Sequence, residues 1–401
     1  MKKFVILFAF LFVPGLSIPA YAGSFTLGEE TKGVTVTTDD SDLNIRIRMQ
    51  PRIDYGELIE SEDKKSFESD SDIYLRRLRI EMSGQLYSKV VKYNLTLSGD
   101  KWEQKGSSNK VNVFYAYTEA KINDSLSVMV GKEKLPYSRV SLSSSSKQLL
   151  IERPSSTEAA KKIFGPTDAY YQPKLAFKGN VLNDVVSYEI AFADGWQNGD
   201  KIYNMDNDGL DRKLQNGGPL YIARIEVSPP GWIEKKKSDA HLGKDRHIAL
   251  GVNFANQGSI EYKESDYEEN RTLTGLDLSG HYKGITAQFE YNEWKIDTDD
   301  PDPALSDKKP GGWYLQAGYF MEGLNIEPVV RYEDYDQDSK ADSKGEKNTT
   351  AGVNWYAKGH SLKVGLNWIH TEYERGASGK PDTASDETDR DIYQVQVQMY
   401  Y

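Results

Sequence analysis

The sequence predicts an all-β fold, a closed antiparallel transmembrane β-barrel of sixteen strands. Three observations favour it: apolar and polar residues alternate along many short segments, long and short connections alternate between those segments, and the C-terminal segment has two distinct faces. In residues 391–401, Val395 and Val397 lie on one face of a strand and Gln394 and Gln396 on the other, because side chains alternate between faces. The last strand of a secreted soluble sandwich would show the same pattern, so the connections have to decide between the two folds.

Sixteen segments carry the alternation that is typical of strands. Their lengths suit tilted strands that cross a bilayer. The expected ranges are 43–55, 73–85, 91–101, 111–122, 126–134, 172–180, 185–193, 220–228, 246–255, 272–282, 284–294, 312–320, 324–333, 348–356, 361–371 and 391–401.

The connections between these strands alternate in length, which a soluble sandwich does not require. Short periplasmic turns and long outer loops are typical of outer-membrane barrels. One connection departs from the rule. Residues 229–245 fall where a short turn is expected, but this connection is long. An even number of strands places both ends of the barrel on the periplasmic side. The long connections are 56–72, 102–110, 135–171, 194–219, 256–271, 295–311, 334–347 and 372–390.

The N-terminal residues are typical of a secretory signal peptide. Lys2 and Lys3 precede an apolar run, and Ala20-Tyr21-Ala22 offers a cleavage site, so residues 1–22 are expected to be removed. Residues 23–42 are then a short periplasmic segment and residues 43–401 a single barrel domain. No later stretch approaches the ~20 apolar residues of a spanning helix, so residence in the outer membrane would depend on the barrel.

Composition argues against several classes of function. The net charge of −11 disfavours nucleic acid as a partner, and the absence of cysteine excludes disulfides, thiolate metal sites and covalent haem attachment. The five histidines show no HExxH spacing, and no nucleophile elbow or P-loop is present. We therefore expect no enzyme, no cofactor and no metal site.

The same alternation assigns residues to the lumen. In the first six strands the inward positions carry nine basic and five acidic residues, whereas later strands are more acidic. A basic wall in a water-filled pore favours anions, although pairing of these charges across strands would account for them equally well. Tyr55, Tyr74, Trp294, Trp313 and Trp355 are expected in interfacial girdles rather than in a core. The inward basic residues are Arg46, Arg48, Arg52, Arg77, Arg79, Lys92, Lys121, Lys174 and Lys178.

The longest connection, 135–171, is expected to fold into the lumen and narrow it. Folded inward, it would bring five basic residues to the constriction, among them Arg139 and Arg153. Guanidinium groups suit bidentate contact with oxyanions. The alternative is an outer surface loop, as many long loops are.

Two stretches resemble the family of phosphate-selective porins O and P. Tyr74-Leu-Arg-Arg-Leu-Arg-Ile80, followed by Gly84, resembles the family's arginine-rich second strand. The second stretch resembles its entry into the third loop, and it comprises Gly131-Lys-Glu-Lys134, Pro136-Tyr137, Ser143–Ser146 and Ile151-Glu152-Arg153. The resemblance implies a sixteen-stranded barrel, a homotrimer, and anion passage steered by basic lumen residues. It also implies a third loop inside the channel, with Lys134, Arg139 and Arg153 at the constriction. Leu135 and Ser138 stand where relatives tend to have Pro and Gly.

The function expected from these features is passive diffusion of small hydrophilic solutes across the outer membrane, with a preference for anions such as phosphate. The alternatives are a non-selective general porin and a structural barrel that sheathes a partner, such as a periplasmic electron-transfer protein. Expected partners are small anions, outer-membrane lipid and lipopolysaccharide, and the barrel-assembly machinery, which would read the end of the chain at Tyr401.

Overall fold

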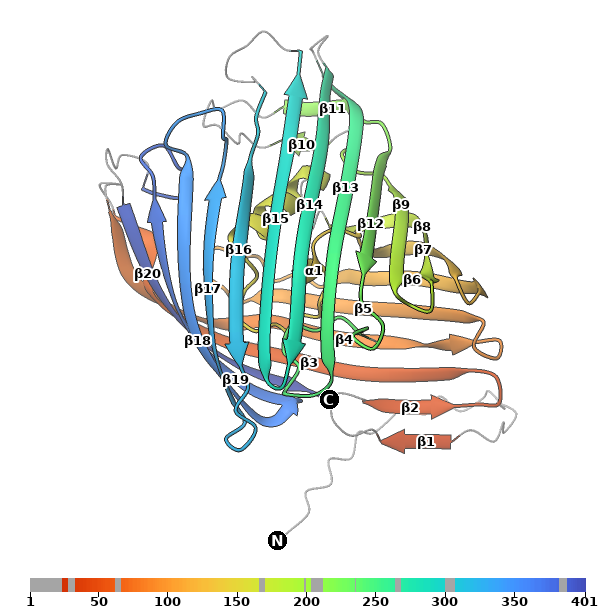
Figure 1. Ribbon diagram of the computed structural model, residues 1–401. Coiled ribbons are helices and arrows are strands. Elements are labelled where there is room, and N and C mark those ends of the chain that lie inside the picture. Colours follow the sequence, from red (N-terminus) through yellow and green to blue (C-terminus); the bar gives the residue numbers. More distant parts are fainter. Residues whose placement is uncertain are drawn as a thin grey trace, which may run out of the picture.

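The computed structural model describes residues 24–27, 33–61, 66–165, 170–197, 200–202, 212–234, 236–263, 268–299, 307–381 and 388–401. Within these residues one antiparallel sheet curls round on itself, and sixteen of its strands close into a barrel (Figure 1). The predicted fold class is therefore confirmed. None of the helices in this part of the chain is long and apolar enough to span a membrane. The predicted signal peptide lies outside the described residues.

Each barrel strand corresponds to one of the predicted segments. The sixteen strands are β3 (Asp42–Glu60), β4 (Phe67–Leu86), β5 (Val91–Trp102), β6 (Asn112–Asn123), β7 (Leu126–Lys134), β8 (Tyr171–Val181), β9 (Val186–Ala193), β12 (Leu220–Val227), β13 (Arg246–Tyr262), β14 (Glu268–Tyr282), β15 (Ile285–Thr298), β16 (Gly311–Tyr319), β17 (Ile326–Asp336), β18 (Gly345–His360), β19 (Leu362–Tyr373) and β20 (Thr388–Tyr400).

The barrel closes where its last strand pairs with its first. β20 lies antiparallel to β3, with Tyr393 opposite Tyr55 and Tyr400 opposite Arg48. On the same edge of β3, residues Asp42–Ile45 pair instead with a short hairpin formed by β1 (Ser24–Leu27) and β2 (Val34–Thr37). A second hairpin, β10 (Lys201–Ile202) with β11 (Arg212–Asn216), belongs to the long connection between β9 and β12. These four short strands lie outside the closed ring.

The faces of the strands follow the predicted alternation. On β3, Ile47 and Ile53 are more than 40% exposed on the outer surface, whereas Arg48 and Gln50 are at most 3% exposed on the inner one. On β20, Val395 faces out while Gln396 faces in. An apolar outer band around a polar interior is what a barrel needs in a bilayer.

Two details differ from the sequence-based expectation. Several strands are longer than predicted at the long-loop end: β13 continues to Tyr262 and β14 begins at Glu268, which leaves much less connection than 256–271. Beyond the lipid both faces of a strand meet water, so the alternation that marks it disappears. The girdle assignment is wrong for Tyr74 and Trp294, which are buried inside the barrel at 5% and 4% exposure.

The seam between β3 and β20 depends on Gly56. Its φ of +125° is rarely adopted by other residues, and a Cβ there would lie 2.3 Å from the carbonyl oxygen of Asp391. We expect Gly56→Val to destabilise the barrel by about 2 kcal/mol or more. The measurement is the temperature at which the folded band disappears in heat-modifiable gel migration. Gly106→Val is the control, since it also has a positive φ but no atom within 4 Å of the added Cβ. Equal transitions for the two variants would contradict the role of the seam.

Candidate functional site

The connection between β7 and β8 folds into the barrel, as predicted; of it, residues 135–165 and 170 are described. It carries two short helices, α1 (Arg139–Leu142) and α2 (Ser155–Ala160), followed by a 3-10 turn, η1 (Lys161–Phe164). Ser138 begins α1, and its side chain accepts a hydrogen bond from the backbone N–H of Ser141, as an N-cap does. Tyr137 and Leu149 are fully buried. The segment 135–165 is called the inward loop from here on.

One side of the inward loop is fixed to the wall formed by β15–β19. Glu290 on β15 accepts hydrogen bonds from the hydroxyls of Ser138 and Thr157, both at 2.9 Å. Arg331 on β17 donates to the carbonyl oxygen of Glu152 at 2.9 Å. Lys363 on β19 donates to the carbonyl oxygen of Gln148 at 2.7 Å. Through these bonds, buried charged side chains of the barrel wall hold the loop. The loop is therefore fixed inside the lumen.

The opposite side of the inward loop faces the arginines of β3 and β4. The carboxylate of Glu152 accepts hydrogen bonds from the guanidinium groups of Arg52, Arg76 and Arg77. Nη2 of Arg76 lies 3.1 Å and Nη2 of Arg77 lies 3.5 Å from its Oε2. Burial alone would raise the pKa of Glu152, but the three guanidinium groups outweigh it and hold that pKa well below its usual range. One loop carboxylate therefore joins two strands of the barrel to the loop.

Arg76 reaches this cluster because of a β-bulge. The register passes from Gln50 opposite Arg77 to Pro51 opposite Leu75, so Arg76 has no partner on β3. A bulge turns two successive side chains to one face, and Pro51 cannot donate to the ladder at that point. Without the bulge, Arg76 would lie on the lipid face of β4, opposite to Arg77.

The remaining arginines of this wall are also paired. Arg46 and Arg48 lie 3.1 and 3.2 Å from the carboxylate of Glu81. Arg79 lies 3.0 Å from Asp100 and packs over the ring of Phe114. In addition, the Nη1 atoms of Arg48 and Arg79 lie 3.3 and 3.5 Å from the hydroxyls of Ser144 and Ser145 on the inward loop. The loop's serine-rich patch thus lies against the arginine-rich wall.

Four other predicted cations are buried as well, and their partners are mostly backbone carbonyl oxygens and carboxylates away from the arginine-rich wall. Lys134 donates to the carbonyl oxygens of Leu142 and Ser143 at 3.0 and 2.9 Å, and Arg153 donates to that of Val140 at 3.1 Å. The side chain of Lys174 is fully buried between Glu133 and Glu189. Arg139 is 1% exposed and lies 2.7 Å from Glu234. Lys134, Arg139 and Arg153 thus contact the loop or hold it in place, whereas Lys174 joins β8 to the neighbouring strands β7 and β9.

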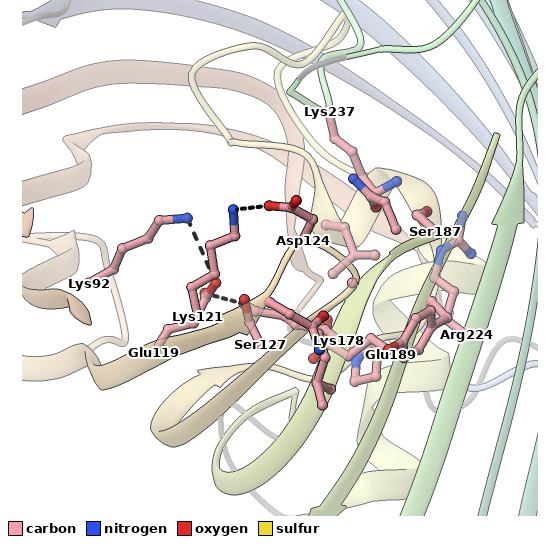
Figure 2. Close-up of a pocket in the computed structure, with 17 residues that line it drawn as sticks. Lys92, Glu119, Lys121, Asp124, Ser127, Lys178, Ser187, Glu189, Arg224 and Lys237 are labelled. Carbon is pink, nitrogen blue, oxygen red and sulfur yellow. Dashed lines mark hydrogen bonds and ion pairs between the residues drawn. The ribbon is translucent and has the colours of Figure 1, made fainter. Parts of the chain in front are cut away.

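Beside the inward loop lies an open cavity of about 450 Å³ (Figure 2). Its lining includes five cationic side chains and three carboxylates, contributed by β5, β6, β8, β9, β12, the turn after β6 and the connection after β12. Lys92 and Lys178 approach Glu119 at 3.8 and 2.8 Å, and Lys92 is 54% exposed. The cations are Lys92, Lys121, Lys178, Arg224 and Lys237, and the carboxylates are those of Glu119, Asp124 and Glu189. Lys237 comes from 229–245, the connection that is long where the sequence predicts a short turn, and it is not among the predicted lumen residues.

Comparisons with known proteins place this barrel in a family. A family model described as phosphate-selective porin O and P matches residues 45–401. The chain belongs to this family. The porin is 35% identical to an uncharacterized protein of Aquifex aeolicus (strain VF5), over 93% of this chain and 91% of that protein.

Solved porin structures share the fold of this porin. An anion-selective porin from Comamonas acidovorans has a TM-score of 0.62 and 13% identity, covering 90% of this chain and all of that one. OmpF of Salmonella typhi, in complex with daunomycin, has a TM-score of 0.60 and 12% identity, covering 92% of this chain and all of that one. The trimer form of OmpT of Vibrio cholerae has a TM-score of 0.57 and 9% identity, covering 90% of this chain and all of that one. Family and fold together make the porin an outer-membrane channel.

Ser138 shows how the porin accommodates one of its departures from the family pattern. The residue has a φ of +56°, a conformation that favours glycine. Its hydroxyl donates to Glu290 and also caps α1, and glycine could make neither interaction. The hydrogen bonds of the side chain thus compensate for the strained backbone.

Proposed function

We propose that the porin is a passive, water-filled channel for small hydrophilic solutes, with a preference for anions such as phosphate. The observation that carries the proposal is the cavity beside the inward loop, where cationic side chains outnumber carboxylates. A narrow passage between walls of low dielectric constant strengthens the effect of such an excess. Ammonium groups with several donors suit the oxygens of phosphate. Such a channel needs no cofactor and performs no catalysis.

We assign the predicted basic residues to three groups. Lys92 and Lys178 line the cavity, where they would meet solutes directly. The paired arginines of β3 and β4, of which all but Arg46 are buried, would attract anions through the positive potential of their wall rather than by direct contact; they are Arg46, Arg48, Arg52, Arg77 and Arg79. The remaining cations would act by keeping the inward loop and the strands that flank it in position; they are Lys134, Arg139, Arg153 and Lys174.

The direct test is the reversal potential of the purified porin in a planar bilayer that separates two concentrations of KCl. We expect a sign that indicates greater permeability to chloride than to potassium, and block of the chloride current by added phosphate. A cation-selective channel would remove the anion preference. A chloride current that phosphate leaves unchanged would remove phosphate as a solute that binds in the pore.

Neutralising four arginines of the basic wall should shift the selectivity toward cations. The variant replaces Arg46, Arg48, Arg77 and Arg79 with glutamine, which leaves Glu81 and Asp100 without their partners. We expect the chloride-to-potassium permeability ratio to fall about tenfold, the change that ~1.4 kcal/mol in relative barrier height produces. The control removes the same charge from exposed turns and loops, by glutamine at Lys89, Lys110, Lys283 and Lys340. An equal shift in both variants would show that net charge, not the wall, sets selectivity.

We also propose a route to the membrane and an assembly state. Residues 1–22 would direct export, the terminal strand ending at Tyr401 would be read by the barrel-assembly machinery, and three copies would associate through apolar outer faces. The support is the apolar outer band and the kinship with porins. Chemical cross-linking in outer-membrane vesicles tests the trimer, and a ladder that stops at one copy would argue against it.

A further inference from the structure

The connection between β12 and β13 is unlike its neighbours at the same end of the barrel. There, β14 and β15 are joined by two residues and β18 and β19 by one. Between β12 and β13 the chain instead runs through residues 228–245, of which 228–234 and 236–245 are described. Asp239 and Ala240, in the middle of this segment, are at most 1% exposed. We call these described residues the inner strap.

The inner strap is bound directly to the inward loop. Glu234 accepts a hydrogen bond from Arg139 at 2.7 Å, and Asp239 accepts one from the hydroxyl of Ser143, also at 2.7 Å. The backbone N–H groups of Asp239 and Ala240 both donate to the carbonyl oxygen of Lys147, at 3.2 and 2.8 Å. These contacts run along the first half of the loop, so strap and loop form one continuous barrier.

The inner strap also reaches the far wall of the barrel. The carbonyl oxygen of Ala240 lies 3.2 Å from Nε2 of His360, at the end of β18. Leu242 packs against a cluster of buried apolar side chains that includes Leu149, Phe320 and Tyr356. A segment that leaves β12, touches β18 and returns to β13 crosses the interior beneath the inward loop.

On the near side the inner strap lies against β12, β13 and β14. Lys237 donates to both oxygens of Glu226 at 2.5 Å, and Figure 2 shows Lys237 extending from the strap toward the cavity. The ring of His241 stacks on that of His281, with centroids 3.3 Å apart. Burial, together with His281 and Arg139, lowers the pKa of His241 and keeps the ring neutral at pH 7.

The strap changes the charge of the lumen as well as its width. Arg139 has Glu234 as its carboxylate partner, and its Nε and Nη1 atoms have no hydrogen-bond partner. Oδ2 of Asp239 is also without a partner. Without the strap, Arg139 would face the water of the lumen with its charge uncompensated. The two strap carboxylates therefore lower the positive potential at the loop.

We propose that the inner strap is a second constriction element, which sets the size limit of the channel from the short-turn end and moderates its anion preference through Glu234 and Asp239. The size limit needs only that the porin is a channel, whereas the effect on selectivity rests on the proposed function. No other described connection at this end of the barrel crosses the lumen in this way.

The test compares the full porin with a variant in which 229–245 is replaced by a four-residue turn. We expect single-channel conductance to rise by about twofold or more and neutral sugars to enter liposomes faster, while selectivity is left to the second variant because this deletion also removes Lys237 from the cavity. Heat-modifiable migration on gels reports whether this variant folds. Unchanged conductance and sugar uptake in a folded variant would overturn the proposed size limit.

A second variant keeps the chain length and tests the strap's effect on selectivity, whether or not the shortened protein folds. Glu234→Gln with Asp239→Asn should raise chloride selectivity, whereas Asp184→Asn with Glu322→Gln, in exposed turns at the same end, should not. No rise above that control would overturn the strap's role in selectivity. A wild-type channel that prefers cations would refute the proposed anion preference instead, and conductance and sugar uptake would still decide the size limit.

Discussion

Glu152→Gln is expected to free the inward loop from β3 and β4 and to make the channel more anion-selective. The substitution removes the carboxylate that Arg52, Arg76 and Arg77 share, while Arg52 keeps its bond to Asp54 at 2.6 Å. Breaking a buried ion pair by removing one partner costs about 3 kcal/mol or more. A quarter of the Glu152 side chain is exposed, so we expect a loss of stability of about 2 to 3 kcal/mol.

Two measurements check this prediction. The folded band in heat-modifiable gels should disappear at a lower temperature, and the reversal potential should move toward the chloride equilibrium potential, because uncompensated guanidinium groups would face the lumen. Glu68→Gln on the exposed outer end of β4 is the matched control. If Glu152→Gln keeps the transition temperature and the reversal potential of the wild type, the cluster neither holds the loop nor contributes to the potential.

Glu290→Ala should loosen the inward loop from the other wall. Glu290 is 1% exposed and accepts hydrogen bonds from Ser138, Thr157 and Asn292, the last at 2.7 Å. Truncation leaves these donors without their acceptor in a buried site, at a cost of about 1 to 3 kcal/mol for each group that finds no other partner. A loop held on one side only should fluctuate into and out of the lumen. Single-channel recordings should then show larger open-channel current noise and a higher mean conductance.

Glu290→Gln separates the hydrogen bonds from the volume of the side chain. Glutamine keeps the shape and one acceptor oxygen, so we expect noise and stability between those of the wild type and of Glu290→Ala. If the alanine variant gives recordings as quiet as the wild type, the serine and threonine contacts are not what holds the loop.

Much of the fold could be predicted because a strand between lipid and water has to alternate. Residues of β3 and β20 such as Ile47, Arg48 and Gln396 lie on the expected faces. The outer ends of β13 and β14 could not be located, because water surrounds them and no apolar face is required. Tyr74 was misplaced because the bulge at Arg76 reverses the alternation before it, so that Tyr74 lies opposite the inward-facing Arg52 and its hydroxyl donates to Asp54.

The candidate site was less predictable, because its geometry depends on contacts between distant parts of the chain. The alternation of faces could assign Arg77 to the lumen. It could not predict that Arg77 pairs with Glu152, which is 75 residues away in the chain. The unusual length of 229–245 was visible, yet nothing in its composition shows that Asp239 would be buried against the inward loop. Local pattern identifies the strands, whereas long-range packing determines where the lumen charges lie.

The pairing of β3 with β20 has a consequence for how the barrel forms. At this seam Arg390 donates to the carbonyl oxygen of Glu57, a residue 333 positions earlier in the chain. Contacts so distant in sequence form slowly, because the entropy of a very long loop is lost before they contribute. Until the final strand arrives, two long strands keep unpaired edges of the kind that promote aggregation. We therefore expect the unfolded chain to need a chaperone, and ring closure to be the last step in the folding of each barrel.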